Sequence, residues 1–306
     1  MASDPISPGP PGPPGLSESE DLEEDELDDA LDEEIPVGNR SGGFAFFDLD
    51  GTLLPYDTQL LFANHVLRAE PIRRLYLCWF LPFLPLALFR VLRSREMKRL
   101  FLSYLLHMRR EALEDYAHEF ADSVIPPLVY PEVMAEIGRH RAAGRTLILN
   151  TASPGAYAQR IAARLGFDHC IATRLEIEDR MPVIPQIDGA NNKRAAKLHA
   201  MAHLLPDSFD PDDPVPLPDS HAYTDSIVDL PLLSCAEHKY VVNPGATLAA
   251  LANDGNWNIL TPPSPHCCKV AERLSGFRQA LGLLRHREAR GARDAGGALG
   301  AGDVGR

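Results

Sequence analysis

Acidic side chains follow two of the short apolar runs in this chain. If these runs are strands of a parallel sheet, the acids stand where such sheets carry their functional side chains. The run Phe44–Phe47 leads into Asp48 and Asp50, and a later predicted strand leads into Asp225 and Asp229. Because parallel strands present their carboxyl ends at one edge of a sheet, we expect these carboxylates to converge. Converging carboxylates repel unless a cation joins them, and oxygen-only ligands favour a hard ion such as Mg²⁺.

A carboxylate in such a site can attack phosphorus, which would place the phosphoryl group on Asp48 as an aspartyl-phosphate. Asp50 would then protonate the departing alcohol and later activate water. Each residue also has a simpler interpretation, since Asp50-Gly51 is a common turn pair and Asp225 and Asp229 are typical acids of a helix N-terminus. Their combination at successive strand ends favours the catalytic interpretation.

The apolar pattern predicts the elements that would position these side chains. A buried strand over 44–47 is followed by helical periodicity over 60–67, 75–92, 97–108 and 113–125. After a helix over 133–143, strands are predicted at 146–149, 170–173, 240–242 and 257–260, and a further strand ends at Tyr223. A hairpin is predicted within 174–187 and a helix over 193–204. This alternation predicts an α/β fold, a doubly wound parallel-sheet core with an inserted helical cap.

Four parts follow along the chain. We expect a disordered acidic tail over 1–41, an α/β core over 42–56 and 130–262, a helical cap over 57–129, and a C-terminal helix with a flexible tail over 263–306. The first part holds Pro and Gly clusters and an acidic run, which cannot bury enough apolar area to offset chain entropy. It is predicted to be a solubilising extension, with a partner-binding acidic arm as the alternative.

The net charge of −13 belongs to the predicted tail, because residues 1–35 carry 13 acids and no Lys or Arg, which leaves 30 acids against 30 bases elsewhere. A neutral body argues against nucleic-acid binding, which needs concentrated positive charge.

Five scattered cysteines without CxxC spacing, and no secretory signal peptide, indicate the cytoplasm. The adjacent pair Cys267 and Cys268 is given no role.

One apolar segment, Leu75–Phe89, raises the question of a membrane. As a helix its fifteen residues would reach about 22 Å, which is short of the hydrocarbon core of roughly 30 Å. Pro82 and Pro85 would shorten or kink it further. We therefore expect a buried helix pair in the cap, and keep an interfacial or re-entrant membrane contact as the alternative.

The motifs together resemble those of the haloacid dehalogenase superfamily. DLDGT (Asp48 to Thr52) is similar to its first motif, Thr151 to its second, Lys193 to its third, and Asp225 with Asp229 to its fourth. The insert between the first two motifs resembles the helical C1-type cap of the phosphoserine-phosphatase-like branch. The strings AYTDSIVDLPLL, VVNP and GNWNIL are similar to the IB-type hydrolases within it.

The resemblance implies roles for the individual residues. Asp48 would be nucleophile and metal ligand, and Asp50 would be the acid/base and offer its backbone carbonyl to Mg²⁺. Asp225 would ligate the metal, with Asp229 supporting the site from behind. Thr151 and Lys193 would hold the phosphoryl oxygens.

The resemblance implies a phosphatase acting on a small phosphorylated metabolite, and leaves its substrate open. Phosphoserine phosphatases carry a Glu after the first motif that meets the substrate amine, whereas this chain has the shorter Asp57. Histidinol phosphate, other amino-alcohol phosphates and a more lipophilic ester remain alternatives. So do a phosphotransferase that uses the same aspartyl-phosphate and a non-catalytic membrane- or protein-binding module. The oligomeric state also stays open.

Overall fold

A computed structural model of the chain describes residues 42–79, 94–183, 185–187 and 192–284. The expected N-terminal tail, the flexible C-terminal tail beyond Leu284, and most of the apolar segment 75–89 lie outside these residues. Within the described part, no helix is both long enough and apolar enough to cross a membrane.

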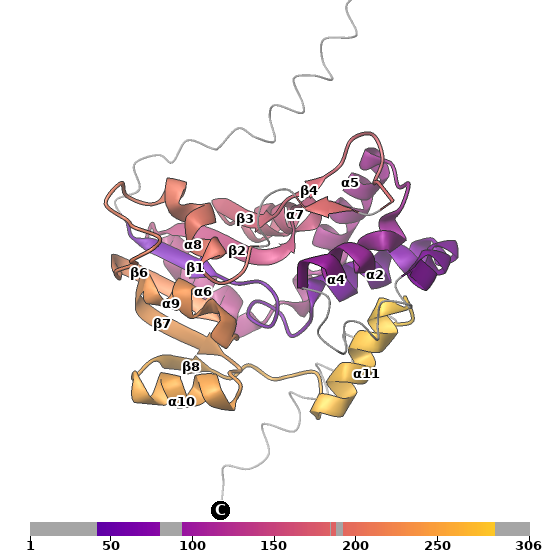
Figure 1. The fold of residues 1–306 in the computed structure, drawn as a ribbon. Coiled ribbons are helices and arrows are strands. Elements are labelled where there is room, and N and C mark those ends of the chain that lie inside the picture. The colour runs from indigo at the N-terminus through magenta and orange to yellow at the C-terminus, as the bar shows by residue number, and fades with distance from the viewer. Residues whose placement is uncertain (1–41, 80–93, 184, 188–191, 285–306) are drawn as a thin grey trace, which may run out of the picture. The chain divides into compact units, whose positions relative to one another are not determined.

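The core is a parallel sheet of six strands in the order β3-β2-β1-β6-β7-β8 (Figure 1). The chain forms β1 first and adds β2 and then β3 on one side of it. It then crosses to the other side of β1, where it adds β6, β7 and β8 in turn. Ligands of such sheets bind beyond the carboxyl ends of the strands where the winding reverses, here β1 and β6. The six strands are β1 (Phe44–Phe47), β2 (Thr146–Pro154), β3 (His169–Thr173), β6 (Leu217–Thr224), β7 (Ala236–Val242) and β8 (Asn258–Leu260).

Helices cover both faces of this sheet, which explains why β1 is apolar without alternation. Phe46 packs into a cluster with residues of α8, α9 and α10, while Phe47 packs into a larger cluster with residues of α6, α7 and the cap. Both side chains are fully buried. The covering helices are α6 (Pro131–Ala142), α7 (Gly155–Leu165), α8 (Ala196–Met201), η6 (Ala202–Leu204), η7 (Ile227–Asp229), α9 (Leu230–Ser234) and α10 (Ala246–Asp254). The predicted doubly wound α/β core with an inserted helical cap is confirmed.

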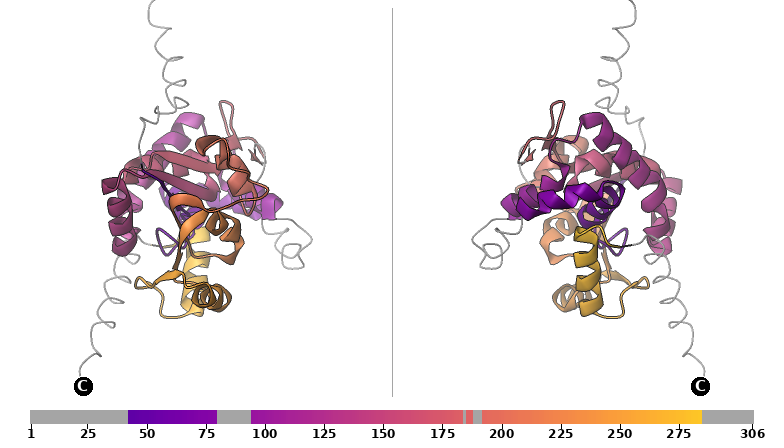
Figure 2. Two further views of the ribbon diagram at one scale, coloured as in Figure 1. Left: turned by 90° about the vertical axis from the view of Figure 1, so that its left-hand side faces the viewer. Right: turned by 90° about the vertical axis from the view of Figure 1, so that its right-hand side faces the viewer.

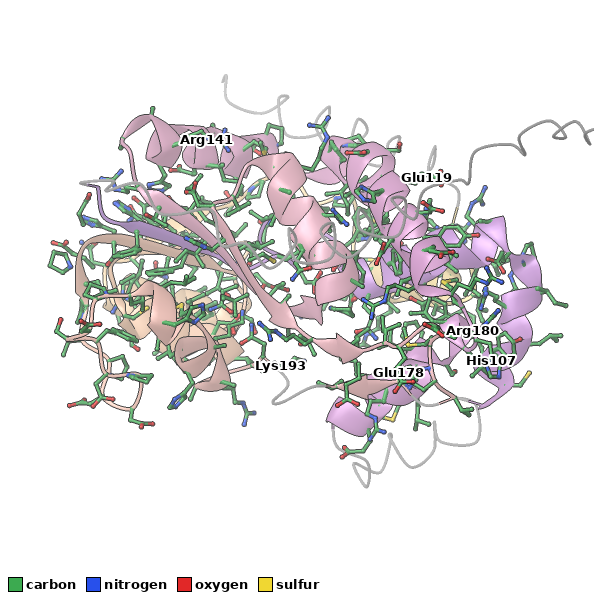
Figure 3. All side chains as sticks on the ribbon, turned by 90° about the horizontal axis from the view of Figure 1, so that it is seen from above. His107, Glu119, Arg141, Glu178, Arg180 and Lys193 are labelled. Atoms are coloured by element: carbon green, nitrogen blue, oxygen red, sulfur yellow. The ribbon has the colours of Figure 1, made fainter. Side chains whose placement is uncertain are left out.

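The cap is the helical segment between β1 and α6. The β4–β5 hairpin joins it, because the Arg110 guanidinium donates to the carbonyls of Ile177 and Glu178, and Figure 3 shows His107, Glu178 and Arg180 close together. The elements of the cap and the hairpin are α2 (Thr58–Ala69), η1 (Pro71–Trp79), α4 (Ser94–Phe101), η3 (Leu102–Leu105), α5 (Arg110–Glu119), η4 (Phe120–Val124), η5 (Pro126–Leu128), β4 (Leu175–Glu176) and β5 (Gln186–Ile187).

The C-terminal helix α11 (Lys269–Ala280) lies against α2 of the cap, as both views of Figure 2 show. The chain end after α11 is tied to the same helix. Asn64 donates to the carbonyl of Leu284 at 3.1 Å and accepts from its backbone N–H at 3.0 Å. Arg74 of η1 donates to the carbonyl of Gly282. The last described residues therefore hold the first helix of the cap in place.

Several predicted boundaries shift in the structure. Strand β2, predicted at 146–149, runs on to Pro154, and β6, predicted to end at Tyr223, starts with residues 217–220 and ends at Thr224. The register of β6 with β7 shifts between Leu217 and His221. Asp219 takes a positive φ of 51° at this irregularity, a conformation that short Asp side chains tolerate. The helix predicted from residue 193 begins at Ala196, after a turn.

A histidine cluster at the sheet predicts acid sensitivity of folding. His140 and His221 are buried with ring centroids 4.5 Å apart, and Arg145, Asp219 and His238 lie beside them. Burial, then neighbouring charge, lowers the pKa of His140 to about 3 and that of His221 to about 4.

The unfolded chain takes up protons at histidine near pH 6.5, whereas the folded cluster resists them, so the free energy of unfolding should fall as pH drops from about 6.5 toward 4. Each histidine contributes at most about 1.4 kcal/mol per pH unit, less where solvent screens it. Urea unfolding across this range should show a shallower pH dependence in His221→Leu than in the wild type. The exposed His118→Gln is the matched control; an equal slope in all three proteins would refute the explanation.

Candidate active site

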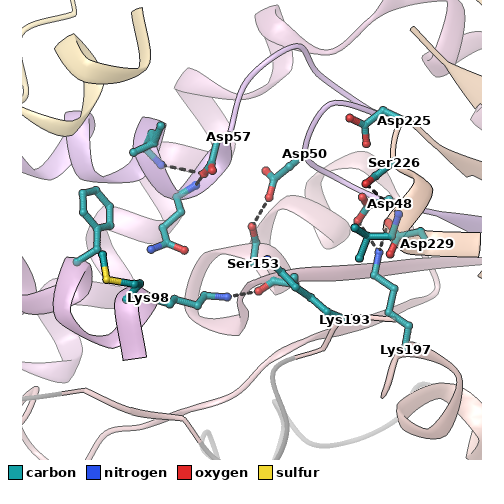
Figure 4. A pocket seen from close by; sticks show the side chains of 16 residues that line it. Asp48, Asp50, Asp57, Lys98, Ser153, Lys193, Lys197, Asp225, Ser226 and Asp229 are labelled. Atoms are coloured by element: carbon teal, nitrogen blue, oxygen red, sulfur yellow. Dashed lines mark hydrogen bonds and ion pairs between the residues drawn. The ribbon is translucent and has the colours of Figure 1, made fainter. Parts of the chain in front are cut away.

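A pocket of about 480 Å³ lies beyond the carboxyl ends of β1 and β6, between the sheet and the cap (Figure 4). Asp48 follows β1 directly, and Asp225 follows β6. The predicted site residues Asp48, Asp50, Asp57, Lys193, Asp225 and Asp229 all line this pocket, together with Lys197, Lys98, Ser153 and Ser226, and the apolar Leu60, Met97, Phe101 and Val228. The fold thus brings together side chains that lie far apart in the sequence.

A buried ion-pair cluster forms the floor of the pocket. Lys197 Nζ lies 2.9 Å from Asp48 Oδ1 and 2.9 Å from Asp229 Oδ2, and its side chain is only 2% exposed. Asp229 Oδ2 also accepts from the Thr224 hydroxyl at 3.2 Å. Although burial lowers the pKa of Lys197, the two carboxylates raise it above its usual value, so the ammonium stays charged.

The lysine beside Asp48 is Lys197, and not Lys193, which the sequence motif suggested. Lys193 precedes α8, is exposed, and lines the pocket farther out (Figures 3 and 4). Lys197 lies within α8, one residue before the buried Leu198 and four before the buried Met201. That spacing puts Lys197 on the face of the helix toward the sheet. The same spacing is present in the sequence, but a helix predicted to start at residue 193 does not single out Lys197.

Asp50 is held by two hydrogen bonds. Its Oδ1 accepts from the backbone N–H of Thr58 at 2.7 Å, and its Oδ2 accepts from the hydroxyl of Ser153 at 2.7 Å. The Thr58 and Ser153 hydroxyls are themselves 2.9 Å apart. These contacts orient the Asp50 carboxylate into the pocket from both the cap and β2. Sequence reasoning missed Thr58 and Ser153, because neither stands at a position where its type alone indicates a role.

Thr151 lies within the second half of β2 and is not among the residues that line the pocket. Its side chain is fully buried, and its Oγ1 accepts from the backbone N–H of Ser153 at 3.0 Å. Asn192 donates to the carbonyl of Thr151 and to Asn150 Oδ1, each at 2.8 Å, and Asn150 donates to the carbonyl of Lys197 at 3.0 Å. This chain of amides fixes α8, and with it Lys197, to the strand end.

Asp57 is the N-cap of α2. Its Oδ1 accepts from the backbone N–H groups of Gln59 at 2.9 Å and Leu60 at 3.2 Å, which satisfies the free donors of the first helical turn. The residue faces the pocket, where surrounding protein and the charge of Asp50 raise the pKa of its carboxyl to about 6. One of its oxygens is thus engaged by the helix, and the other remains toward the pocket.

The inner pocket holds more carboxylate groups than its one buried ammonium offsets. Burial raises the pKa of Asp48 well above its usual range; Lys197 lowers it in part, while Asp229 and Asp225 raise it further. The pKa of Asp225 is raised to about 6, chiefly by burial. One ammonium therefore does not balance these carboxylates, and a divalent cation would.

The donor chemistry fits Mg²⁺. Asp48 and Asp225 offer carboxylate oxygens, which are ligands that Mg²⁺ prefers. Gly51 is required beside Asp225, because its φ is +76° and a Cβ there would collide with Asp225 Oδ2. No three His, Cys, Asp or Glu side chains of the described residues form a complete metal cage. Mg²⁺ does not need one, since it keeps several waters and takes one or two carboxylates plus substrate phosphate oxygens.

A family model and several named relatives match this chain. The model of the haloacid dehalogenase-like hydrolase family matches residues 45–234. A Streptomyces azureus protein named for inhibition of morphological differentiation is 26% identical over 76% of this chain and 82% of its own length. A probable phosphatase of Mycobacterium tuberculosis is 27% identical over 74% and 77%.

Solved structures show the same fold. A Bordetella pertussis protein of unknown function is 26% identical, with a TM-score of 0.59 over 72% of this chain and 98% of that one. A probable phosphoserine phosphatase from Vibrio cholerae, 16% identical, has a TM-score of 0.51 over 80% and 67%. At that identity the second likeness concerns the fold alone.

Proposed function

Because the chain belongs to the haloacid dehalogenase-like hydrolases, we propose that it is a Mg²⁺-dependent phosphatase that hydrolyses a small phosphate monoester through an aspartyl-phosphate on Asp48. The observation that carries the proposal is the side-by-side position of two differently held carboxylates in one pocket. Asp48 is paired with Lys197, while Asp50 is held by Thr58 and Ser153. Such a pair can divide the tasks of nucleophile and proton donor.

In the first half-reaction an Asp48 carboxylate oxygen attacks phosphorus, the bond from phosphorus to the ester oxygen breaks, and Asp50 gives its proton to the departing alcohol. In the second, Asp50 takes a proton from water, the water oxygen attacks phosphorus, and the bond to Asp48 breaks. Inorganic phosphate leaves, Asp48 is again a carboxylate, and Asp50 again carries the proton that it gives up in the first half-reaction.

Lys197 has two tasks in this scheme. It orients Asp48 by binding one carboxylate oxygen, and its positive charge offsets the negative charge that gathers on the phosphoryl group. Asp229 keeps the ammonium in place from the opposite side. Bound Mg²⁺, held by Asp48, Asp225 and the backbone carbonyl of Asp50, would supply further charge neutralisation at the phosphoryl oxygens.

Transfer of the phosphoryl group to an acceptor other than water would use the same residues, so phosphotransfer is distinguished from hydrolysis by product analysis. We favour hydrolysis because a Mycobacterium tuberculosis relative that matches 74% of this chain is named a probable phosphatase. Phosphoserine is not favoured over other esters, since the candidate amine ligand Asp57 already caps α2 with one oxygen.

A panel of phosphate monoesters, assayed for phosphate release with Mg²⁺ and with EDTA, tests the proposed function. It should include p-nitrophenyl phosphate, phosphoserine, histidinol phosphate and a lysophosphatidic acid. We expect turnover of at least one ester in Mg²⁺, a loss of about 10²-fold or more in EDTA, and recovery when Mg²⁺ is restored. Turnover that is equal with and without the metal would contradict the metal dependence, and no turnover of any ester would contradict the phosphatase.

A further inference from the structure

Two lysines in the pocket have no part in the reaction proposed above. Lys98 comes from α4 of the cap and Lys193 from the turn before α8, and both line the pocket. Lys197 is fully engaged by its two carboxylates. No carboxylate of the described residues lies within ion-pair distance of Lys98 or Lys193, although Asp50 and Asp57 act on Lys98 from farther away.

Lys98 is held at the core by neutral groups. Its ammonium donates to the carbonyl of Ala152 and, at 3.4 Å, to the hydroxyl of Thr173, so a cap residue reaches across to the ends of β2 and β3. Burial and the charge of Lys193 lower its pKa to about 8, although Asp50 and Asp57 act in the opposite direction. At neutral pH it still carries its charge for most of the time.

Two ammonium groups that repel each other in a partly enclosed pocket gain energy when an anion binds between them. The phosphoryl group that is cleaved cannot serve both lysines, because it must lie against Asp48 and Lys197 on the floor of the pocket. Apolar side chains of the cap, among them Leu60 of α2 and Met97 and Phe101 of α4, line the same pocket. A short carbon skeleton fits such a lining.

We propose that Lys98 and Lys193 form a second anion subsite, so that the substrate carries a carboxylate or a second phosphate in addition to the ester that is cleaved. This inference rests on the proposed function, because it takes Asp48 as the place of phosphoryl transfer. It gives Lys193 a role in substrate choice, whereas Lys197 remains the lysine that orients the nucleophile Asp48.

Three substrates with the same two-carbon skeleton test the subsite. They are hydroxyethyl phosphate, which has no second anion, phosphoglycolate, which has a carboxylate, and ethylene glycol bisphosphate, which has a second phosphate. We expect the wild type to bind at least one doubly anionic compound with a lower KM than hydroxyethyl phosphate. Lys98→Met and Lys193→Met should each raise that lower KM roughly fivefold, whereas the KM for hydroxyethyl phosphate should rise by less than about twofold.

Lys269→Met, which removes an exposed lysine at the start of α11, is the control and should change none of the three values. Lys193 makes the cleaner variant, because Lys98→Met also removes a contact between cap and core. Which doubly anionic compound responds identifies the second group as carboxylate or phosphate. Equal KM changes for all three substrates, or no change for any, would overturn the proposal.

Calorimetric binding of the same compounds separates failure of the subsite from failure of the proposed function. If the wild type releases phosphate from an ester of the panel above but from none of these three compounds, the phosphatase stands and the subsite is judged by binding alone. Tighter binding of a doubly anionic compound that is lost in Lys193→Met supports the subsite. Equal binding of all three compounds by wild type and Lys193→Met refutes it.

Discussion

The variant Asp48→Asn is expected to release phosphate from the best substrate at least about 10⁴-fold more slowly than the wild type. Its amide has nearly the shape of the carboxylate but cannot attack phosphorus as an anion. Lys197 keeps its 2.9 Å contact with Asp229, so the buried ammonium is not left alone. The loss should therefore lie in kcat, measured by phosphate release, with the melting temperature of the variant close to that of the wild type.

Asp115→Asn is the matched control. It makes the same chemical change at an exposed position of α5 that does not line the pocket. Its rate should equal that of the wild type. A folded Asp48→Asn protein that keeps more than about a tenth of wild-type activity would exclude Asp48 as the nucleophile.

Replacing Lys197 by methionine should lower kcat by about 10²–10³-fold, since the change removes a charge that is fixed against the nucleophile and the phosphoryl group. The variant also leaves Asp48 and Asp229 buried without their cation, which costs stability unless one of them takes up a proton. The unfolding free energy must therefore be measured first, and kcat compared at a temperature where the protein is folded.

Lys193→Met provides the contrast within the same helix region. Its kcat with p-nitrophenyl phosphate should fall by less than about tenfold, because Lys193 is exposed and does not touch Asp48. Lys269→Met should leave the rate unchanged. A larger loss of activity in Lys193→Met than in a folded Lys197→Met would contradict the conclusion that Lys197 is the lysine that supports the nucleophile Asp48.

The fold could be predicted because its signals are local and agree with one another. The fully apolar run Phe44–Phe47 indicates a strand covered on both faces. Gly166, with a φ of 76°, is a local stop signal of the same kind, because glycine readily takes the left-handed conformation that ends α7. Strand β6 was harder to delimit. Its first residues include Pro218 and the bend at Asp219, and they belong to the sheet because Leu217 pairs with Ala236 of β7, which no local pattern reveals.

The candidate site could be predicted in part. Acids at strand ends are visible in the sequence because a short motif surrounds them, and Asp48, Asp50, Asp225 and Asp229 do meet in one pocket. Sequence spacing does not decide which lysine contacts Asp48, because one helical turn separates Lys193 from Lys197 and the start of α8 determines which of them faces the sheet. The groups that orient Asp50 come from the cap and from β2, so their proximity depends on tertiary packing.

The central claim is a phosphoryl group carried by Asp48, and its direct test is to trap that intermediate. Enzyme mixed with substrate and Mg²⁺ is quenched in acid within milliseconds, digested, and searched by mass spectrometry for a phosphorylated peptide. We predict one phosphoryl group on the peptide that contains Phe44–Phe47 and Asp48, with fragment ions that assign it to Asp48, and none in Asp48→Asn. A turnover-competent enzyme that carries the phosphoryl group on another residue, or that still forms the adduct in Asp48→Asn, would contradict the mechanism.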